Sequence, residues 1–159
     1  MPPLLPLLLL GACAAPLPLI NEIMADNAST VADTFGDWAD WIEICNPGSE
    51  PLGLGGWFLT DTPDDPATWA LPASWQVPAG GHLLLWATGT ADEDAFSLPF
   101  KVSADGETLV LLREEDGEVS EIDSVTFGPQ GPDTSVARTP DCGDAWVRSE
   151  SPTPGAPNP

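Results

Sequence analysis

Three acidic residues and two tryptophans fall within residues 37–43 and provide the side chains that glycoside hydrolysis needs. They are Asp37, Asp40 and Glu43, with Trp38 and Trp41 between them. A glycosidase uses one carboxyl group as a general acid and a second as a nucleophile or base. A small secreted hydrolase would therefore have a cleft around these acids, with the pKa of one carboxyl raised. Because the chain has 25 Asp and Glu residues, close pairs also arise by chance, and hydrolysis is the secondary interpretation.

The acidic residues can instead supply oxygen ligands to calcium, which takes about 6–8 of them, many from loops. The predicted metal ligands are Asp26, Asp33 and Asp37 in one loop, with Asn27, and Asp61, Asp64 and Asp65 in a second; Asp92, Glu93 and Asp94 form a third group. None of these groups has the spacing of an EF-hand loop. A calcium-stabilised extracellular module is one hypothesis, and a solvated acidic surface that needs no metal is the alternative that we favour.

Motifs for other enzyme chemistry are missing from the sequence. It contains no Gly-rich phosphate loop, no His-Glu-x-x-His zinc motif and no Gly-x-Ser-x-Gly elbow. His82 is the only histidine, and no nucleophile is marked out as its partner. We therefore predict a protein that is not an enzyme and has no catalytic residues, with calcium as the one cofactor considered.

The charge balance restricts the partners. Four Lys and Arg residues stand against 25 acids, which gives a formal net charge of −21. Phosphate contacts require clustered cations, so nucleic-acid binding is not expected, and neither is electrostatic docking on an anionic membrane. The expected partner is an unidentified protein or cell-surface component. At 159 residues and 42% hydrophobic content, the chain fits one globular domain.

The N-terminal residues indicate export. Residues 1–12 carry no charged side chain and include a short leucine run, too short to span a bilayer. The segment Leu10-Gly11-Ala12-Cys13 resembles a bacterial lipobox. We predict a signal peptide over residues 1–12, lipid attachment at Cys13 and a linker over 13–18, with an outer-membrane or cell-surface location. A plain signal peptide, giving a periplasmic or secreted protein, and a buried N-terminal strand are the alternatives.

The cysteine count agrees with export. If Cys13 carries lipid, Cys45 and Cys142 remain as an even pair. In an oxidising compartment such a pair is a disulfide candidate. Two free buried thiols are the alternative, and the sequence does not choose between them.

The body of the chain, residues 19–147, is predicted to be all-β. Short apolar or alternating segments recur between Gly, Pro and Asn turns; we expect strands over 19–24, 40–45, 57–60, 83–87, 108–113 and 118–125. Asp116-Gly117 predicts a hairpin. Ile42 and Ile44 should share one strand face, and Trp57 and Trp86 should be buried between two sheets. The Pro-rich residues 148–159 are predicted to be an extended, poorly ordered tail.

Several blocks of the sequence resemble the lamin tail domain family, in order over residues 18–155. They are INEIMA (20–25), DWIEICNP (40–47), LGLGGWFLTD (52–61), VPAGGHLLLWATG (77–89), SADGETLVLLREEDGEV (103–119) and the closing SVAR, Pro140-Asp141, Trp146 and Thr153-Pro154-Gly155. The resemblance, to bacterial exported members, implies an immunoglobulin-like antiparallel β-sandwich. In that motif Glu43 is expected to face solvent or to pair with Arg138.

Function does not follow from this fold. The chromatin association of nuclear lamin tails is not transferred, because the few cations here are scattered along the chain. The sequence-based hypothesis is a non-catalytic, surface-anchored module of the bacterial cell envelope for binding, adhesion or scaffolding.

Overall fold

The computed structural model describes residues 16–65 and 69–159. Cys13 and the predicted signal peptide lie outside these residues. The described residues form ten β-strands and no helix, and they therefore contain no helix that is long and apolar enough to cross a membrane. The strands are β1 (Leu19–Met24), β2 (Trp41–Cys45), β3 (Leu52–Gly53), β4 (Trp57–Thr60), β5 (Gln76–Val77), β6 (His82–Trp86), β7 (Glu107–Glu115), β8 (Glu118–Phe127), β9 (Ser135–Thr139) and β10 (Ala145–Ser149).

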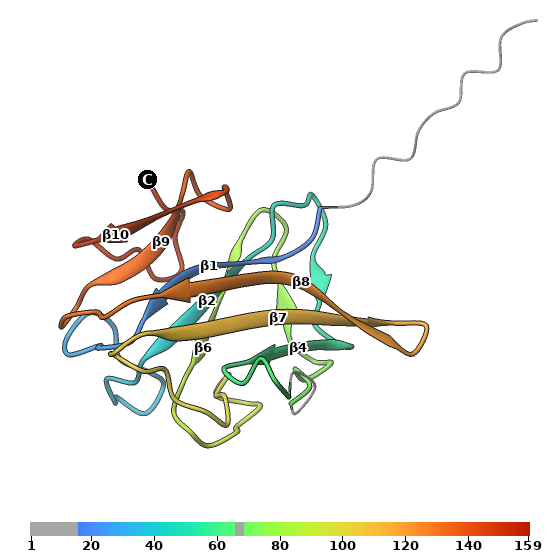
Figure 1. Cartoon of the computed structure of the whole chain (residues 1–159), viewed down its shortest axis with the longest axis horizontal. Helices are drawn as coiled ribbons and strands as arrows, with labels where there is room; N and C mark the ends of the chain where they lie inside the picture. Colours follow the sequence, from blue (N-terminus) through green and yellow to red (C-terminus); the bar gives the residue numbers. More distant parts are fainter. Residues whose placement is uncertain (1–15, 66–68) are drawn as a thin grey trace, which may run out of the picture.

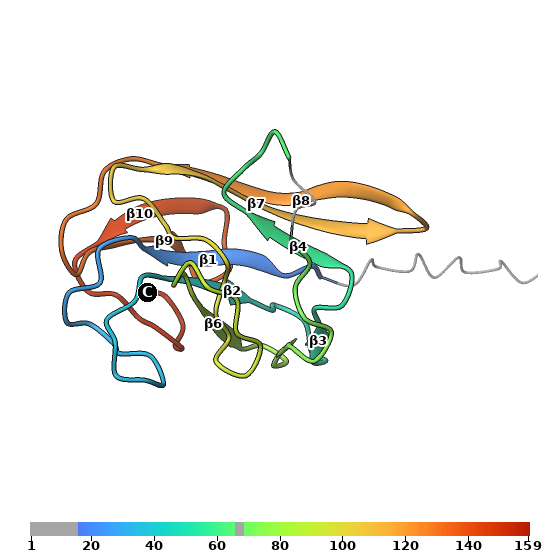
Figure 2. The same ribbon diagram turned by 90° about the horizontal axis from the view of Figure 1, so that it is seen from below.

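The strands build two packed antiparallel layers (Figures 1 and 2). One sheet has the order β10-β9-β1-β2-β6 and the other the order β4-β7-β8, while β3 and β5 form a small separate pair. Figure 2 shows the layers edge-on, with β7 and β8 on one side of β1 and β2. This arrangement confirms the all-β sandwich.

Alternation along the strands places the core between the layers. Ile42 and Ile44 of β2 face Leu59 of β4 and Leu109 and Leu111 of β7 in one cluster of buried side chains. Each of these side chains is fully buried, and burying one contributes about 1.5–3 kcal/mol. Trp57 joins the same cluster, as predicted.

A second apolar cluster lies on the outer face of the five-stranded sheet. Met24, Trp41 and Trp86 form it, with Val31 and Phe96 packed beside them. Trp41 and Trp86 are direct cross-strand partners on β2 and β6. The prediction that Trp86 lies between the two sheets is therefore wrong, because strand alternation turns it to the opposite face from Leu85.

The predicted hairpin between β7 and β8 is confirmed. Asp116 and Gly117 both have positive φ values, 54° and 81°, as a two-residue turn that matches strand twist requires. The tip of this hairpin extends beyond the rest of the sandwich (Figure 1).

The C-terminal segment differs from its prediction. Strand β10 runs to Ser149 and crosses the expected boundary at residue 147, and residues 150–159 fold back on the five-stranded sheet. Asn158 is only 6% exposed. The prediction of a poorly ordered tail is wrong because backbone N–H groups of this segment find buried acceptors in the sheet, which a count of prolines does not reveal.

Candidate functional site

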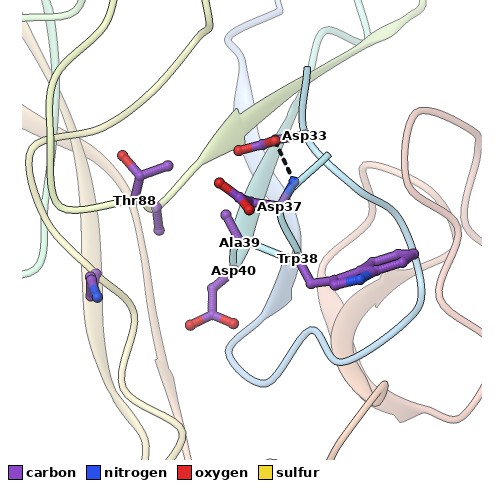
Figure 3. A pocket seen from close by; sticks show the side chains of 8 residues that line it. Asp33, Asp37, Trp38, Ala39, Asp40 and Thr88 are labelled. Atoms are coloured by element: carbon purple, nitrogen blue, oxygen red, sulfur yellow. Dashed lines mark hydrogen bonds between the residues drawn. The ribbon is translucent and has the colours of Figure 1, made fainter. Parts of the chain in front are cut away.

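A cavity of about 300 Å³ opens beside the segment that joins β1 to β2 (Figure 3). It is lined by Asp33, Asp37, Trp38, Ala39, Asp40, Ala87, Thr88 and Lys101. We call it the acid-lined cavity. Three carboxyl groups come from one loop, and the single lysine comes from the segment between β6 and β7. Figure 3 shows the indole of Trp38 directed away from these carboxyl groups, and that side chain is half exposed.

Hydrogen bonds within the loop hold the acid-lined cavity in shape. The Asn27 amide donates to the carbonyl oxygens of Val31 and Ala39, each at 2.7 Å. Asp33 Oδ1 accepts the backbone N–H groups of Phe35 at 2.8 Å and Asp37 at 2.9 Å. Loop turns of this kind are favoured by short polar side chains that bond to nearby backbone.

Asp133 ties the same loop to the segment between β8 and β9. Its carboxylate accepts the N–H groups of Ala28 at 3.0 Å and Ser29 at 2.8 Å, and the hydroxyl of Thr30 at 2.9 Å. These hydrogen bonds, led by those from Ser29, lower the pKa of Asp133 to about 2. Together with the bonds from Asn27 to Val31 and Ala39, these contacts hold the loop in place.

The pKa of Asp40 in the acid-lined cavity is raised above its ordinary value. Burial raises the pKa of Asp40 and the nearby carboxylate of Asp26 adds to that rise, while the N–H of Asn27, at 3.1 Å, acts in the opposite direction. A cleft that contains a carboxyl group with a raised pKa is the arrangement that a hydrolase would have. The third predicted acid, Glu43, does not line this cavity.

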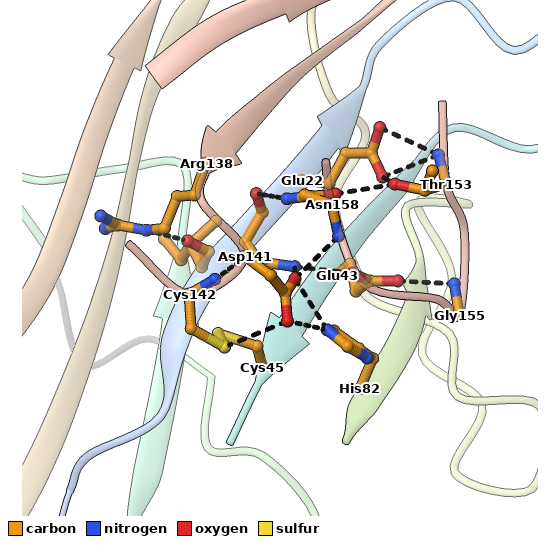
Figure 4. A network of polar contacts seen from close by, with 12 residues as sticks. Glu22, Glu43, Cys45, His82, Arg138, Asp141, Cys142, Thr153, Gly155 and Asn158 are labelled. Atoms are coloured by element: carbon orange, nitrogen blue, oxygen red, sulfur yellow. Dashed lines mark hydrogen bonds and ion pairs between the residues drawn. A yellow bond between two sulfur atoms is a disulfide. The ribbon is translucent and has the colours of Figure 1, made fainter. Parts of the chain in front are cut away.

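Glu43 belongs to a second region, which we call the buried polar cluster (Figure 4). It lies on the outer face of the five-stranded sheet, beneath the C-terminal segment. Its members are Asn21 and Glu22 of β1, Glu43 of β2, His82 of β6, Asp141 of the β9–β10 turn, and Thr153, Gly155 and Asn158 of the C-terminal segment. A β-bulge after Ile20 turns both Asn21 and Glu22 outward.

The two glutamates of the buried polar cluster have no exposed surface. Glu43 accepts the side-chain amide of Asn21 at 3.0 Å and the N–H of Gly155 at 2.6 Å. Burial raises the pKa of Glu43 to about 7, although these hydrogen bonds oppose the rise. Glu22 accepts the hydroxyl of Ser135 at 2.5 Å and the N–H of Thr153 at 3.1 Å, and burial raises its pKa as well.

The expectation that Glu43 faces solvent or pairs with Arg138 is wrong. The C-terminal segment covers Glu43, and the guanidinium of Arg138 points elsewhere. Arg138 donates to the carbonyl oxygens of Ile20 at 2.7 Å and Gly143 at 2.6 Å, and to Asp123 at 2.7 Å. It therefore joins β9 to both layers of the sandwich.

The cluster continues into a histidine–aspartate pair beside the two cysteines. His82 Nε2 lies 3.0 and 3.1 Å from the two oxygens of Asp141. Partial burial acts to raise the pKa of Asp141, but hydrogen bonds from Asn158, Asn21 and the imidazole lower it on balance. Cys45 and Cys142 are joined as a disulfide in the structure, with Cα atoms 6.0 Å apart.

The Lamin Tail Domain family matches residues 14–129, nearly three quarters of the chain. The chain belongs to the lamin tail domain family. Its members are immunoglobulin-like domains of a non-enzymatic kind, in agreement with the two antiparallel layers described above. No curated protein and no solved structure matches the chain.

In this lamin tail domain the predicted calcium ligands are spread over several places. Asp33 and Asp37 line the cavity, whereas Asp61, Asp64 and Asp65 follow β4, and Asp26 lies beside Asp40. Within residues 16–65 and 69–159, the one set of three or more His, Cys, Asp or Glu ligand atoms within 4.8 Å of one another is His82, Asp141 and Cys142. The fold therefore does not bring the predicted calcium ligands together at one site.

Sequence reasoning missed most of the buried polar cluster. The block beginning Ile20-Asn21-Glu22 was visible as a family motif, but its polar residues had no assigned role. Asp133 stands in a Pro- and Gly-containing turn without a pattern that marks it, and Pro140-Asp141 is part of a family block that assigns no role to Asp141. Asp133 bonds to Ala28, 105 residues away, and Asp141 bonds to His82 and Asn21, 59 and 120 residues away, so only the fold identifies these contacts.

Proposed function

We propose that this lamin tail domain protein is an exported, lipid-anchored binding module of the bacterial cell envelope. Its partner would be a cationic protein or another cationic component of the cell surface, held at the acid-lined cavity. The observation that carries this proposal is the gathering of three carboxyl groups, from Asp33, Asp37 and Asp40, on one cavity of a protein with a net charge of −21.

The loop that bears these carboxyl groups is suited to binding because it is already ordered. Hydrogen bonds from Asn27, Asp33 and Asp133 fix it, so little conformational entropy is lost when a partner docks. The same loop exposes two aromatic rings, Phe35 at 72% and Trp38 at 50%. Aromatic faces attract Lys and Arg side chains, and the negative field of the whole protein speeds their approach.

Calorimetric titration of the full chain with an oligolysine peptide tests the binding site. Asp37→Asn should weaken binding about fivefold, because an ion pair at an accessible site contributes up to about 1 kcal/mol. Asp65→Asn is the matched control, since it removes one charge from an exposed loop position outside the cavity. Equal weakening by the two substitutions would mean that only net charge matters and would end the assignment to this cavity.

Export and anchoring need a separate test. Metabolic labelling with palmitate should label the parent chain and leave Cys13→Ala unlabelled, and the parent should fractionate with the outer membrane. Equal labelling of the two chains would remove the anchor from the proposal, leaving a secreted or periplasmic module.

The raised pKa of Asp40 keeps glycoside hydrolysis as a second candidate function. Asp37 lines the same cavity and would be the partner carboxylate. The experiment is hydrolysis of aryl glycosides by the parent chain and by Asp40→Asn. Turnover that is lost in the variant would establish an enzyme, and equal background release by both chains would exclude this pair.

Calcium stabilisation remains the third candidate, since Asp33 and Asp37 of the predicted set do line one cavity. A thermal melt followed by tryptophan fluorescence should separate the cases. A midpoint that rises with calcium but not with magnesium or potassium indicates a specific site, because a ligand of the native state stabilises it. A rise that all three salts reproduce indicates charge screening alone.

A further inference from the structure

Four residues with metal-binding side chains meet where the end of β2, the start of β6 and the β9–β10 turn come together (Figure 4). Cys45 and His82 are direct cross-strand partners, and Cys142 is bonded to Cys45. The donor atoms of His82, Asp141 and Cys142 all lie within 4.8 Å of one another. Neither the lipid anchor nor the acid-lined cavity involves any of them.

We propose that, when the Cys45–Cys142 disulfide is reduced, these four residues bind one zinc ion. The protein then has two exclusive forms, a disulfide form and a metal form. Two sulfurs, one imidazole nitrogen and one carboxylate oxygen are a ligand set that zinc accepts with tetrahedral geometry. The proposal is independent of the binding function assigned to the acid-lined cavity.

The spacing of three of the four donor atoms, those of His82, Asp141 and Cys142, is close to that around a tetrahedral ion. Zinc lies ~2.0 Å from nitrogen or oxygen and ~2.3 Å from sulfur, so neighbouring ligand atoms stand roughly 3.3–3.8 Å apart. In the disulfide form His82 Nε2 is 3.0 Å from Asp141, and Cys142 Sγ is 3.9 Å from the other carboxylate oxygen. Cys45 Sγ, which is bonded to Cys142 Sγ, lies outside this group of three, so its side chain has to turn toward the ion once the S–S bond breaks.

The surroundings orient the ligands and leave an entry path. Asp141 Oδ1 accepts the Asn21 amide at 2.9 Å and the Asn158 N–H at 3.0 Å, which leaves Oδ2 directed at Cys142. Hydrogen bonds of this kind fix the ligands of metal sites. The Asp141 side chain is 25% exposed and that of His82 only 5%, so an ion can enter from the turn. The buried Glu43 and Glu22 on the neighbouring strands are further acidic groups of the same cluster.

Reduction followed by zinc binding converts the disulfide form into the metal form. A dithiol reductant transfers two electrons and two protons, so the S–S bond breaks, two thiols form and the reductant becomes a cyclic disulfide. Zinc then replaces the two thiol protons, which leave to solvent. Nε2 of a neutral imidazole coordinates through its lone pair, so its proton moves to Nδ1. Reoxidation by a disulfide reverses the exchange and releases the ion.

Cobalt titration of the full chain tests the proposal, because Co²⁺ reports its ligands by absorption. The chain carries Cys13→Ser, so that Cys45 and Cys142 are its only thiols, and is reduced with a phosphine under anaerobic conditions. We expect one equivalent to give sulfur-to-cobalt charge-transfer and tetrahedral d–d bands that zinc abolishes. The oxidised chain should give neither. Equal binding by the oxidised chain would overturn the proposal.

Variants of the two non-sulfur ligands separate a four-ligand site from simple dithiol chelation. His82→Gln and Asp141→Asn should each weaken zinc binding by at least ~10-fold, the lower end of the effect of losing even a supporting residue. Asp144→Asn, an exposed acid of the same turn, is the matched control and should bind as the parent does. Affinities that match this control in both variants would overturn the proposal.

Circular dichroism covers the case in which the reduced chain unfolds. Zinc should then restore the near-ultraviolet signal of the parent and of Asp144→Asn, but not that of His82→Gln. Each variant is first shown to melt as a folded protein in its disulfide form. Restoration of His82→Gln by the same zinc concentration would contradict the proposal.

Discussion

Glu43 should dominate the pH dependence of stability near neutrality. Burial raises its pKa from 4.5 to about 7, so the folded protein holds a proton there that the unfolded chain releases. At 1.36 kcal/mol for each pH unit of difference, this shift corresponds to about 3 kcal/mol. The charged or polar groups that face it are Glu22 on β1, His82 on β6, and Asn21 and Gly155, which donate hydrogen bonds to it.

The raised pKa of Glu43 makes the protein less stable as the pH rises. A group whose pKa is higher in the folded state stabilises fully below its unfolded pKa, and that contribution is lost as the pH rises through the folded value. The protein should therefore be most stable near pH 4.5 and lose about 3 kcal/mol by pH 8. Glu22, whose pKa is also raised, acts in the same direction. Asp133 and Asp141, whose pKa values are lowered, act only below about pH 4.

Glu43→Gln removes this titration and is the perturbation to measure. The glutamine side chain places its NH₂ group against one of the two N–H donors, from Asn21 and Gly155, whose hydrogen bonds Glu43 accepts. Relative to protonated Glu43, the contact between two donors lowers the free energy of unfolding by about 1–3 kcal/mol, and this cost does not change with pH. The variant should thus be about 1–3 kcal/mol less stable than the parent at pH 4.5, and equal to the parent or up to about 2 kcal/mol more stable at pH 8, where the parent has lost the contribution of the Glu43 proton. The assay is urea unfolding, followed by tryptophan fluorescence, at closely spaced pH values across this range.

Equal pH slopes for the parent and Glu43→Gln would refute the assignment of the proton to Glu43. Glu150→Gln is the control, because it removes a charge from an exposed position at the start of the same C-terminal segment. Its slope should match that of the parent. A parent whose stability rises between pH 5 and 8 would refute the sign of the argument.

Three further outcomes are expected. Arg138→Lys should lower the free energy of unfolding by about 2 kcal/mol, since a lysine cannot make the three bonds to Ile20, Gly143 and Asp123 at once. Gly106→Ala should cost about 2 kcal/mol or more, because φ is +96° and the new Cβ would lie 2.4 Å from a carbonyl oxygen. Removal of residues 150–159 should uncover Glu43, and the resulting hydration should remove most of the pH dependence between pH 4.5 and 8.

Chemical unfolding measures all three, and each has its own control or contrary result. Gly117 also has a positive φ, +81°, but its new Cβ would have nothing within 4 Å, so Gly117→Ala should cost less than Gly106→Ala. Equal losses would contradict the steric argument. If Arg138→Lys has the same free energy of unfolding as the parent, the hydrogen bonds of the guanidinium contribute nothing net to stability. An unchanged pH slope in the truncated chain would show that the C-terminal segment does not bury Glu43.

The sequence determined the architecture of this protein through short-range signals. Alternation over β2 assigned Ile42 and Ile44 to the core, and Asp116-Gly117 marked the β7–β8 turn, since both depend on neighbouring residues alone. The ordered sequence blocks that resemble the lamin tail domain family predicted the sandwich. Strands β9 and β10 were not predicted as strands, because their apolar alternation is weak and their pairing partners are each other and β1.

Only the tertiary structure decided which polar residues are buried together. Glu22, Glu43, His82 and Asp141 come from three strands and a turn, and their contacts span from about 20 to 130 residues. Sequence pattern specifies which face of a strand a side chain occupies, but not whether another segment covers that face. Here residues 150–159 cover it, and that covering converts an outward-facing glutamate into a buried one with a pKa of about 7. The environment of a charge is a property of the whole fold, because it depends on everything that excludes water from it.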